Sequence, residues 1–181
     1  SGATLEQKQI ATAPAEWSAI ACSDDFIFQV AAEGYGTSTG RVWLSIDGGE
    51  NWTQNAGAPA AQWKSVTINN DGTMIAAVVG GNTTNTTTLG SIWISEDSGG
   101  TWSEQTPIPG TKSWQSITSN TDGTMLAAAV GDGLLGGVSG TWVNRGQGPQ
   151  NWGDGNVPSI ASSSVGDKLV AVANNDNIFL S

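Results

Sequence analysis

The chain has 181 residues, of which 25 are glycine, 9 are tryptophan and 12% are charged, and its net charge is −10. This length supports one domain with its own core, and the composition favours strands and turns over helices. With six Lys and Arg residues and no long apolar run, the sequence predicts no nucleic-acid partner, no anionic membrane surface and no membrane insertion.

Four similar runs of residues open four repeats, and each is followed by a polar turn and an apolar run. The opening runs are WSAIACS from Trp17, WKSVTIN from Trp63, WQSITSN from Trp114 and VPSIASS from Val157. The apolar runs are FIFQVAA from Phe26, TMIAAVV from Thr73, TMLAAAV from Thr124 and KLVAVA from Lys168. Asn-Asp-Gly and Thr-Asp-Gly between apolar runs are strong hairpin signals, so each repeat is predicted to begin with two antiparallel strands, A and B.

Each repeat is predicted to continue with two further strands, C and D. Strand C is expected at 41–45, 91–95, 136–139 and 177–181, and strand D at 51–54, 101–106 and 141–145. In the first two repeats the connection between C and D reads SIDGGENW and SEDSGGTW, which is the pattern Ser-x-Asp-x-Gly-x-x-Trp. In such a turn the aspartate accepts backbone N–H groups, the glycine takes a positive φ and the tryptophan packs back on the strand.

This pattern resembles the Asp-box, or BNR, repeat of sialidase-like and photosystem-assembly-factor-like β-propellers. The residues that match are Ser45, Asp47, Gly49, Trp52, Ser95, Asp97, Gly99 and Trp102. The resemblance implies an all-β fold in which each blade has four antiparallel strands and the box joins strand C to strand D. It implies a structural role for these residues and says little about activity, because one fold hosts many functions.

The two ends of the chain complement each other. Residues 1–20 align with residues 98–117, so the first strand has the sequence of a strand D, while the last strand is a strand C without its own D. We therefore expect one four-bladed β-propeller domain over 1–181, closed by pairing of the N-terminal strand with the C-terminal strand. The blades are expected at about 16–55, 62–106, 113–146, and 157–181 together with 1–10. An arc that needs a second copy to complete eight blades stays an alternative, as do two half-rings that exchange their ends.

Tryptophan supplies much of the expected core. Trp17, Trp63 and Trp114 recur at the blade period and are predicted to pack between blades. The other tryptophans predicted to be core residues are Trp43, Trp52, Trp93, Trp102 and Trp142. Cys22 is the only cysteine, which excludes an intrachain disulfide, and its apolar run predicts a small buried side chain.

The B–C and D–A loops lie on one face of such a propeller, and they are longer and more varied than the A–B turns. Aromatic rings stack on the C–H groups of sugars, and carboxylates and amides bond to hydroxyls, so this face is the predicted binding face. The candidate binding residues on it are Glu33, Tyr35, Asp132, Arg145, Trp152, Asp154 and Asn156. The alternative is that they are ordinary turn residues, because Asn, Asp and Gly dominate turns.

Three Asn-x-Thr triplets, at Asn51, Asn82 and Asn85, are candidate glycosylation sites in a secretory context. No cofactor and no metal site are predicted. The chain has no histidine and no loop of the D-x-[DN]-x-[DN]-G type, so Ca²⁺ is left open without a motif to support it.

Catalysis is not expected, because a sialidase-like site needs three arginines, whereas the chain has two, Arg41 and Arg145, and a single tyrosine. The sequence therefore predicts a non-catalytic binding module of an extracellular or particle-surface protein, which binds a carbohydrate or a receptor. The alternative is a structural or assembly subunit that makes protein–protein contacts in a homo- or hetero-assembly. A sialidase-like glycoside hydrolase is the least favoured class.

Overall fold

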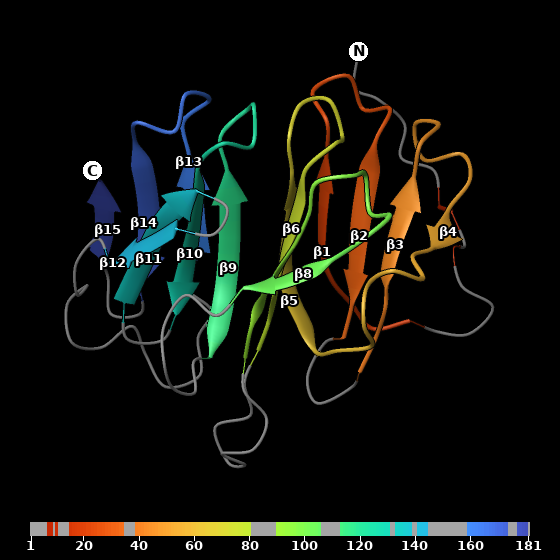
Figure 1. Ribbon diagram of the computed structural model, residues 1–181, viewed down its shortest axis with the longest axis horizontal. Helices are drawn as coiled ribbons and strands as arrows, with labels where there is room; N and C mark the ends of the chain where they lie inside the picture. The colour runs from red at the N-terminus through yellow and green to blue at the C-terminus, as the bar shows by residue number, and fades with distance from the viewer. Residues whose placement is uncertain are drawn as a thin grey trace.

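The protein is an all-β protein in its computed structural model (Figure 1). The structure describes residues 7–8, 10, 15–34, 39–80, 90–105, 113–130, 133–138, 141–144, 159–173 and 177–180. No helix occurs among these residues, and hence none with the length and apolar character that crossing a membrane requires.

Four antiparallel sheets follow one another along the chain, and within each sheet the strands pair in chain order. The first sheet contains β1 (Trp17–Cys22), β2 (Gln29–Glu33), β3 (Val42–Ser45) and β4 (Thr53–Gln54). The second contains β5 (Trp63–Ile68), β6 (Ile75–Val79), β7 (Ile92–Ser95) and β8 (Ser103–Gln105). The third contains β9 (Trp114–Ser119), β10 (Leu126–Val130), β11 (Gly133–Val138) and β12 (Thr141–Asn144). The fourth contains β13 (Ser159–Ser162), β14 (Leu169–Ala173) and β15 (Asn177–Leu180).

The turn between the first two strands of each sheet is closed by a side chain. Asp71 Oδ1 accepts a hydrogen bond from Thr73 N at 3.0 Å, and Asp122 accepts one from Thr124 N at the same distance. The corner of the turn needs a positive φ, which glycine supplies at Gly72 (75°), Gly123 (75°) and Gly166 (76°). In the first sheet Phe26 stands at this corner with a φ of 62°, a conformation that costs a non-glycine residue about 1–2 kcal/mol.

Successive sheets pack face to face. We call the face of a sheet on the side of the preceding sheet its upstream face, and the opposite face its downstream face. The first core joins Val30, Ala32 and Val42 to Trp63, Val66, Ile68, Ile75, Ala77 and Val79. The second joins Met74, Ala76, Val78, Ile92 and Ile94 to Trp114, Ile117, Leu126 and Ala128. The third joins Ala127 and Ala129 to Ile160 and Ala171. Because side chains alternate across a strand, one apolar strand serves two cores.

The structure does not confirm closure of the ring. Contacts link β1 to β5, β5 to β9 and β9 to β13, but no comparable contact links β1 to β13 among the described strands. The fourth sheet has three described strands, and Figure 1 places its last strand, β15, at the end of the molecule away from β4. Most of the N-terminal residues predicted to complete this sheet lie outside the described part of the chain. Lys8, from the same segment, pairs with Glu50 of the first sheet, with Nζ and Oε2 2.8 Å apart.

Two predictions of burial are wrong for the first sheet. Trp63 and Trp114 are buried as predicted, but Trp17 is 39% exposed. Cys22, which was also predicted to be buried, is exposed. Both side chains belong to the upstream face of the first sheet, which no described residue of another sheet covers. Their exposure therefore follows from the missing neighbour and not from their local sequence.

Two further predictions need adjustment. Strand C of the third repeat was expected at 136–139, but β11 begins earlier, at Gly133, because Leu134 and Leu135 pair with Ala129 and Ala128 of β10. The other tryptophans predicted to be core residues are only half-buried where the structure describes their side chains, at Trp43, Trp52, Trp93 and Trp102. The side chain of Trp142 lies outside the described residues.

Candidate functional site

The two Ser-x-Asp turns join the third strand to the fourth strand of the first and second sheets. In the second, Ser95 Oγ donates to Asp97 Oδ1 at 2.8 Å and accepts from Gly99 N at 2.8 Å. Asp97 also accepts the backbone N–H of Thr101 at 2.8 Å and its hydroxyl at 2.7 Å. Each carboxylate oxygen therefore has a partner inside the turn.

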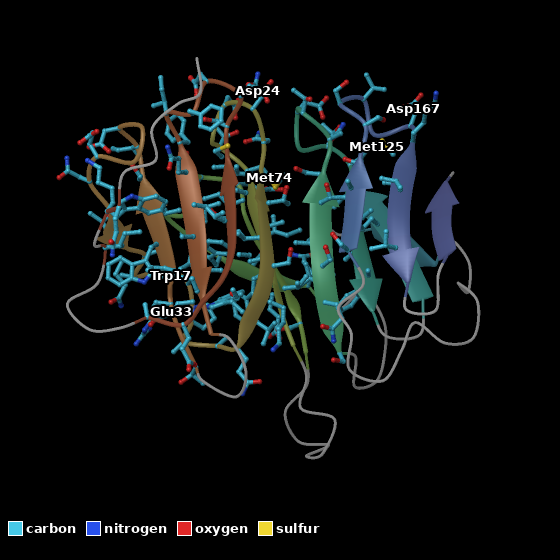
Figure 2. The ribbon with its side chains drawn as sticks, turned by 180° about the vertical axis from the view of Figure 1, so that it is seen from behind. Trp17, Asp24, Glu33, Met74, Met125 and Asp167 are labelled. Atoms are coloured by element: carbon cyan, nitrogen blue, oxygen red, sulfur yellow. The ribbon has the colours of Figure 1, made fainter. Side chains whose placement is uncertain are left out.

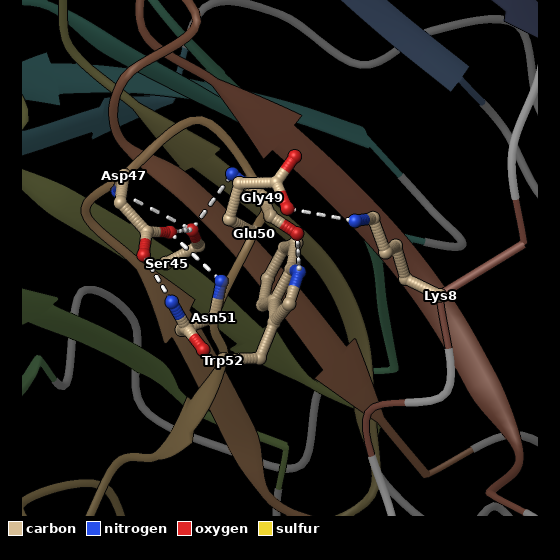
Figure 3. Close-up of polar contacts among 7 residues, drawn as sticks. All are labelled: Lys8, Ser45, Asp47, Gly49, Glu50, Asn51 and Trp52. Atoms are coloured by element: carbon tan, nitrogen blue, oxygen red, sulfur yellow. Dashed lines mark hydrogen bonds and ion pairs between the residues drawn. The ribbon is translucent and has the colours of Figure 1, made fainter.

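The first turn repeats this geometry (Figure 3). Asp47 accepts the backbone N–H of Asn51 at 2.9 Å and its side-chain amide at 2.7 Å. Trp52 Nε1 donates to the carbonyl of Gly49 at 3.1 Å, which folds the indole back on the turn. Asn51, a predicted glycosylation site, is thus engaged through its amide in the turn itself.

These bonds also set the ionisation of the two aspartates. The backbone N–H of Thr101, the Thr101 hydroxyl and Ser95 lower the pKa of Asp97. The backbone N–H of Asn51, its amide and Ser45 do the same to the pKa of Asp47. Because both carboxylates are charged and already accept hydrogen bonds within their turns, these two turns serve to connect strands and are not candidate ligand sites.

The opposite end of the first sheet carries a different group of side chains, which we call the loop-end cluster: Glu33, Trp43 and Trp17. Glu33 ends β2, and its Oε2 accepts both Arg41 N and Trp43 Nε1, each at 3.3 Å. Trp17 meets Trp43 edge to face, with ring centroids 6.3 Å apart. Figure 2 places Trp17 and Glu33 toward the end of the molecule away from the turns of Asp24, Met74, Met125 and Asp167.

Glu33 departs from the other three sheets. In β6, β10 and β14 the last residue is apolar, as Val79, Val130 and Ala173. In the second sheet Trp93, the counterpart of Trp43, donates instead to Ser91 Oγ at 2.9 Å. The first sheet alone therefore sets a carboxylate against an indole at this place, and aligning the four repeats would have revealed the substitution.

Glu33 is the one candidate binding residue that the structure describes. The remaining candidate binding residues and two candidate glycosylation sites lie outside the described residues: Tyr35, Asp132, Arg145, Trp152, Asp154, Asn156, Asn82 and Asn85. Sequence reasoning assigned Trp17 and Trp43 to the core, so it missed their place beside Glu33.

The turn end of the molecule has an open hollow of about 440 Å³ between the second and third sheets. It is lined by Asn69, Thr73, Met74, Glu96, Asp122, Gly123 and Thr124. Asn69 Oδ1 accepts a hydrogen bond from Met74 N, and Asp122 Oδ1 accepts one from Thr124 N. The main polar groups that line the hollow are therefore already engaged in turn hydrogen bonds. In the part of the chain that the structure describes, no group of three or more His, Cys, Asp or Glu side chains is placed to hold a metal ion.

No protein-family model matches the chain, and no curated protein matches it either. The predicted resemblance to the Asp-box family therefore gains no support from these comparisons. Solved structures do match. An ancestral GH74 enzyme aligns with 91% of this chain at a TM-score of 0.63 and 17% identity. A GH74 enzyme of Niastella koreensis aligns with 87% at a TM-score of 0.61 and 13% identity.

These structures correct the prediction that excluded an enzyme, because both are enzymes of a glycoside hydrolase family. At such identities the likeness concerns the fold and transfers no activity to this chain. The chain spans 24% and 26% of the length of the two enzymes, about a quarter of each. It is therefore an all-β chain whose successive antiparallel sheets are arranged as in part of a β-propeller.

Proposed function

We propose that the protein binds a neutral carbohydrate at the loop-end cluster of its first sheet. The observation that carries the proposal is Glu33, a half-buried carboxylate that accepts a hydrogen bond from the indole of Trp43 where the other sheets have an apolar residue. An indole face stacks on the C–H groups of a sugar ring, and a carboxylate accepts hydrogen bonds from sugar hydroxyls.

The geometry leaves room for such bonds. Both hydrogen bonds that Glu33 accepts with its side chain go to Oε2, so among the described residues Oε1 is open to a ligand hydroxyl. The net charge of −10 disfavours anionic glycans, which is why the proposed ligand is neutral. Carbohydrate-active neighbours with the same sheet arrangement add support at the level of fold.

Affinity electrophoresis tests the proposal, with gels that contain a neutral plant polysaccharide or a sulfated one. We expect the neutral polysaccharide to retard the protein, and Glu33→Ala to weaken this retardation by about tenfold or more, because a charged hydrogen-bond acceptor is lost. Glu104→Ala, which removes an exposed carboxylate from β8, is the matched control and should migrate like the unmodified chain. Equal retardation of both variants, or no retardation by any neutral polysaccharide tried, would refute the proposal.

A second function, assembly with other protein chains, is favoured by a separate observation. Large apolar side chains are exposed on the two uncovered sheet faces, at Ile20 in the first sheet and Val172 in the fourth. Light scattering across a concentration series tests this function. We expect a mass above the 18.5 kDa of one chain, and a constant mass of one chain would refute it.

A further inference from the structure

We propose that the occupant of the two open faces is a second copy of this chain, with the fourth sheet of each copy packed on the first sheet of the other. This inference rests on the assembly function and names its partner. It starts from the three sheet-to-sheet contacts inside the chain, which all join a downstream face to the next upstream face. A chain that ends in one free face of each kind carries two halves of the same heterologous interface.

The exposed fractions show that the end faces are built like the covered ones. On upstream faces Val66, Ile117 and Ile160 are 6%, 4% and 6% exposed, whereas their counterpart Ile20 is 68% exposed. On downstream faces Ala32, Val78 and Ala129 are each 0% exposed, whereas their counterpart Val172 is 40% exposed. Both ends thus present a residue that is buried wherever another sheet is present.

The fourth sheet also has a serine at the position where the second and third sheets each use a serine to bind the following sheet. Ser65 Oγ accepts Ile117 N at 3.2 Å, and Ser116 Oγ accepts Ile160 N at 3.4 Å, each across a boundary between sheets. Ser159 is their counterpart in the fourth sheet, and it is exposed. Across the proposed contact between copies, Ser159 Oγ would accept a hydrogen bond from the backbone N–H of Ile20.

The turn end shows a matched exchange of residues. A Cβ at Gly72 would clash with Phe28 of the preceding sheet, and at Gly123 and Gly166 it would meet Met74 and Met125 of the preceding sheet at 2.7 and 2.9 Å. At the open upstream face, Phe26 stands where the other sheets have these glycines. At the open downstream face, Lys168 stands where the other sheets have Phe28, Met74 and Met125, and both Phe26 and Lys168 are exposed. A lysine over a phenylalanine ring is a favourable cation–π pair, so the two replacements suit each other and not an internal boundary.

Lys8, from the N-terminal segment, already makes a contact like one that a preceding sheet makes. Asn55, which follows β4, donates from Nδ2 to Gly99 O in the Ser-x-Asp turn of the next sheet, at 2.7 Å. Lys8 pairs with Glu50 in the equivalent turn of the first sheet, and residues 1–20 resemble the segment that ends one sheet and starts the next. This segment therefore suits the three-stranded fourth sheet of a second copy docked upstream of β1.

A docked copy covers Trp17, as the first sheet covers Trp63. It would also reach Glu33 and Trp43. Their counterparts in the covered second sheet are Val79, which is 7% exposed, and Trp93, which packs against the core between the first two sheets. A second copy and a carbohydrate would therefore compete for this face, so the carbohydrate proposal concerns chains whose first sheet is uncovered.

A disulfide between copies tests the contact. Thr67 Oγ1 and Ser119 Oγ lie 2.9 Å apart across the boundary between the second and third sheets. Their counterparts at the proposed contact are Ala161 and Cys22, both exposed. Two sulfurs at such positions are close enough to bond, so Ala161→Cys should give a reducible dimer of two chains after mild oxidation. As a positive control, Thr67→Cys with Ser119→Cys, in a chain that also carries Cys22→Ser, should form its bond within one chain.

Thr53→Cys, on the exposed strand β4, measures disulfides formed by random collision and should give no disulfide-linked dimer. Ile20→Asp added to Ala161→Cys should abolish the dimer while circular dichroism stays unchanged. A disulfide within one chain, between Cys22 and the thiol introduced by Ala161→Cys, would overturn the proposal in favour of a self-closed ring. If Ala161→Cys forms no disulfide under conditions in which the positive control does, the proposal is also overturned. If the unmodified chain still forms a dimer by light scattering in that case, the assembly function stands and only this seating is refuted.

Discussion

The first and second sheets have nearly the same sequence pattern but opposite surroundings. Both begin with a tryptophan, turn at an aspartate and close with a Ser-x-Asp turn, and their strands pair in the same order. The second sheet is covered on both faces, while the upstream face of the first lies open, with Ile20 exposed and Val66 buried at equivalent places. A repeat pattern thus defines how one sheet folds, and burial is decided by the neighbouring sheet.

The largest expected difference comes from truncating the equivalent isoleucines. Ile117→Ala removes a buried side chain from the core between the second and third sheets and should lower the free energy of unfolding by about 2–5 kcal/mol. Ile20→Ala removes an exposed side chain and should lower it by less than about 0.5 kcal/mol in a dilute single chain. Urea denaturation followed by tryptophan fluorescence measures both. A loss at Ile20 as large as that at Ile117 would mean that the first sheet is covered after all.

Substitutions at the turn corners should produce the next largest change in the free energy of unfolding, with opposite signs in the first and second sheets. Gly72→Ala forces a side chain into a φ of 75° and against the ring of Phe28, and should destabilise by about 2 kcal/mol. Phe26→Gly relieves a positive φ at an exposed corner and should stabilise by up to about 1 kcal/mol. Thermal melts at low protein concentration separate the two signs. A destabilised Phe26→Gly would indicate that the aromatic ring has a partner in the single chain.

Much of the fold was predictable because local chemistry determines it. The strands that begin at Trp17, Trp63 and Trp114, and the turns at Asp71 and Asp122, follow from hairpin signals that act over a few residues. Closure was not predictable in this way, since the complementarity of residues 1–20 with the last strand fits one chain or two copies equally well. The same limit explains Trp17, whose sequence is that of a core residue without a sheet to cover it.

The candidate site was predictable only in part. Glu33 was singled out as a loop residue, but the site proposed around it also needs the indole of Trp43 on the neighbouring strand, which periodicity had assigned to the core. The informative signal was the departure from the repeat, a carboxylate in place of Val79, Val130 and Ala173. Residues that break a repeat are better site candidates than residues that merely suit a loop.

The smallest expected effect is the loss of stability at acidic pH, which should be similar for the Ser-x-Asp turns of the two sheets. Turn hydrogen bonds, led by the backbone N–H groups of Asn51 and Thr101, lower the pKa of Asp47 and Asp97 below the ordinary 3.8. Their contribution to stability is therefore complete above that value and is lost as the pH falls through the lowered folded-state pKa. Asp47→Asn and Asp97→Asn should each lower the melting temperature slightly near neutral pH, by similar amounts, and the deficit should shrink in acid. Because both aspartates are exposed and bonded alike, a clearly larger deficit at Asp47 would show that the open face weakens the turn beside it.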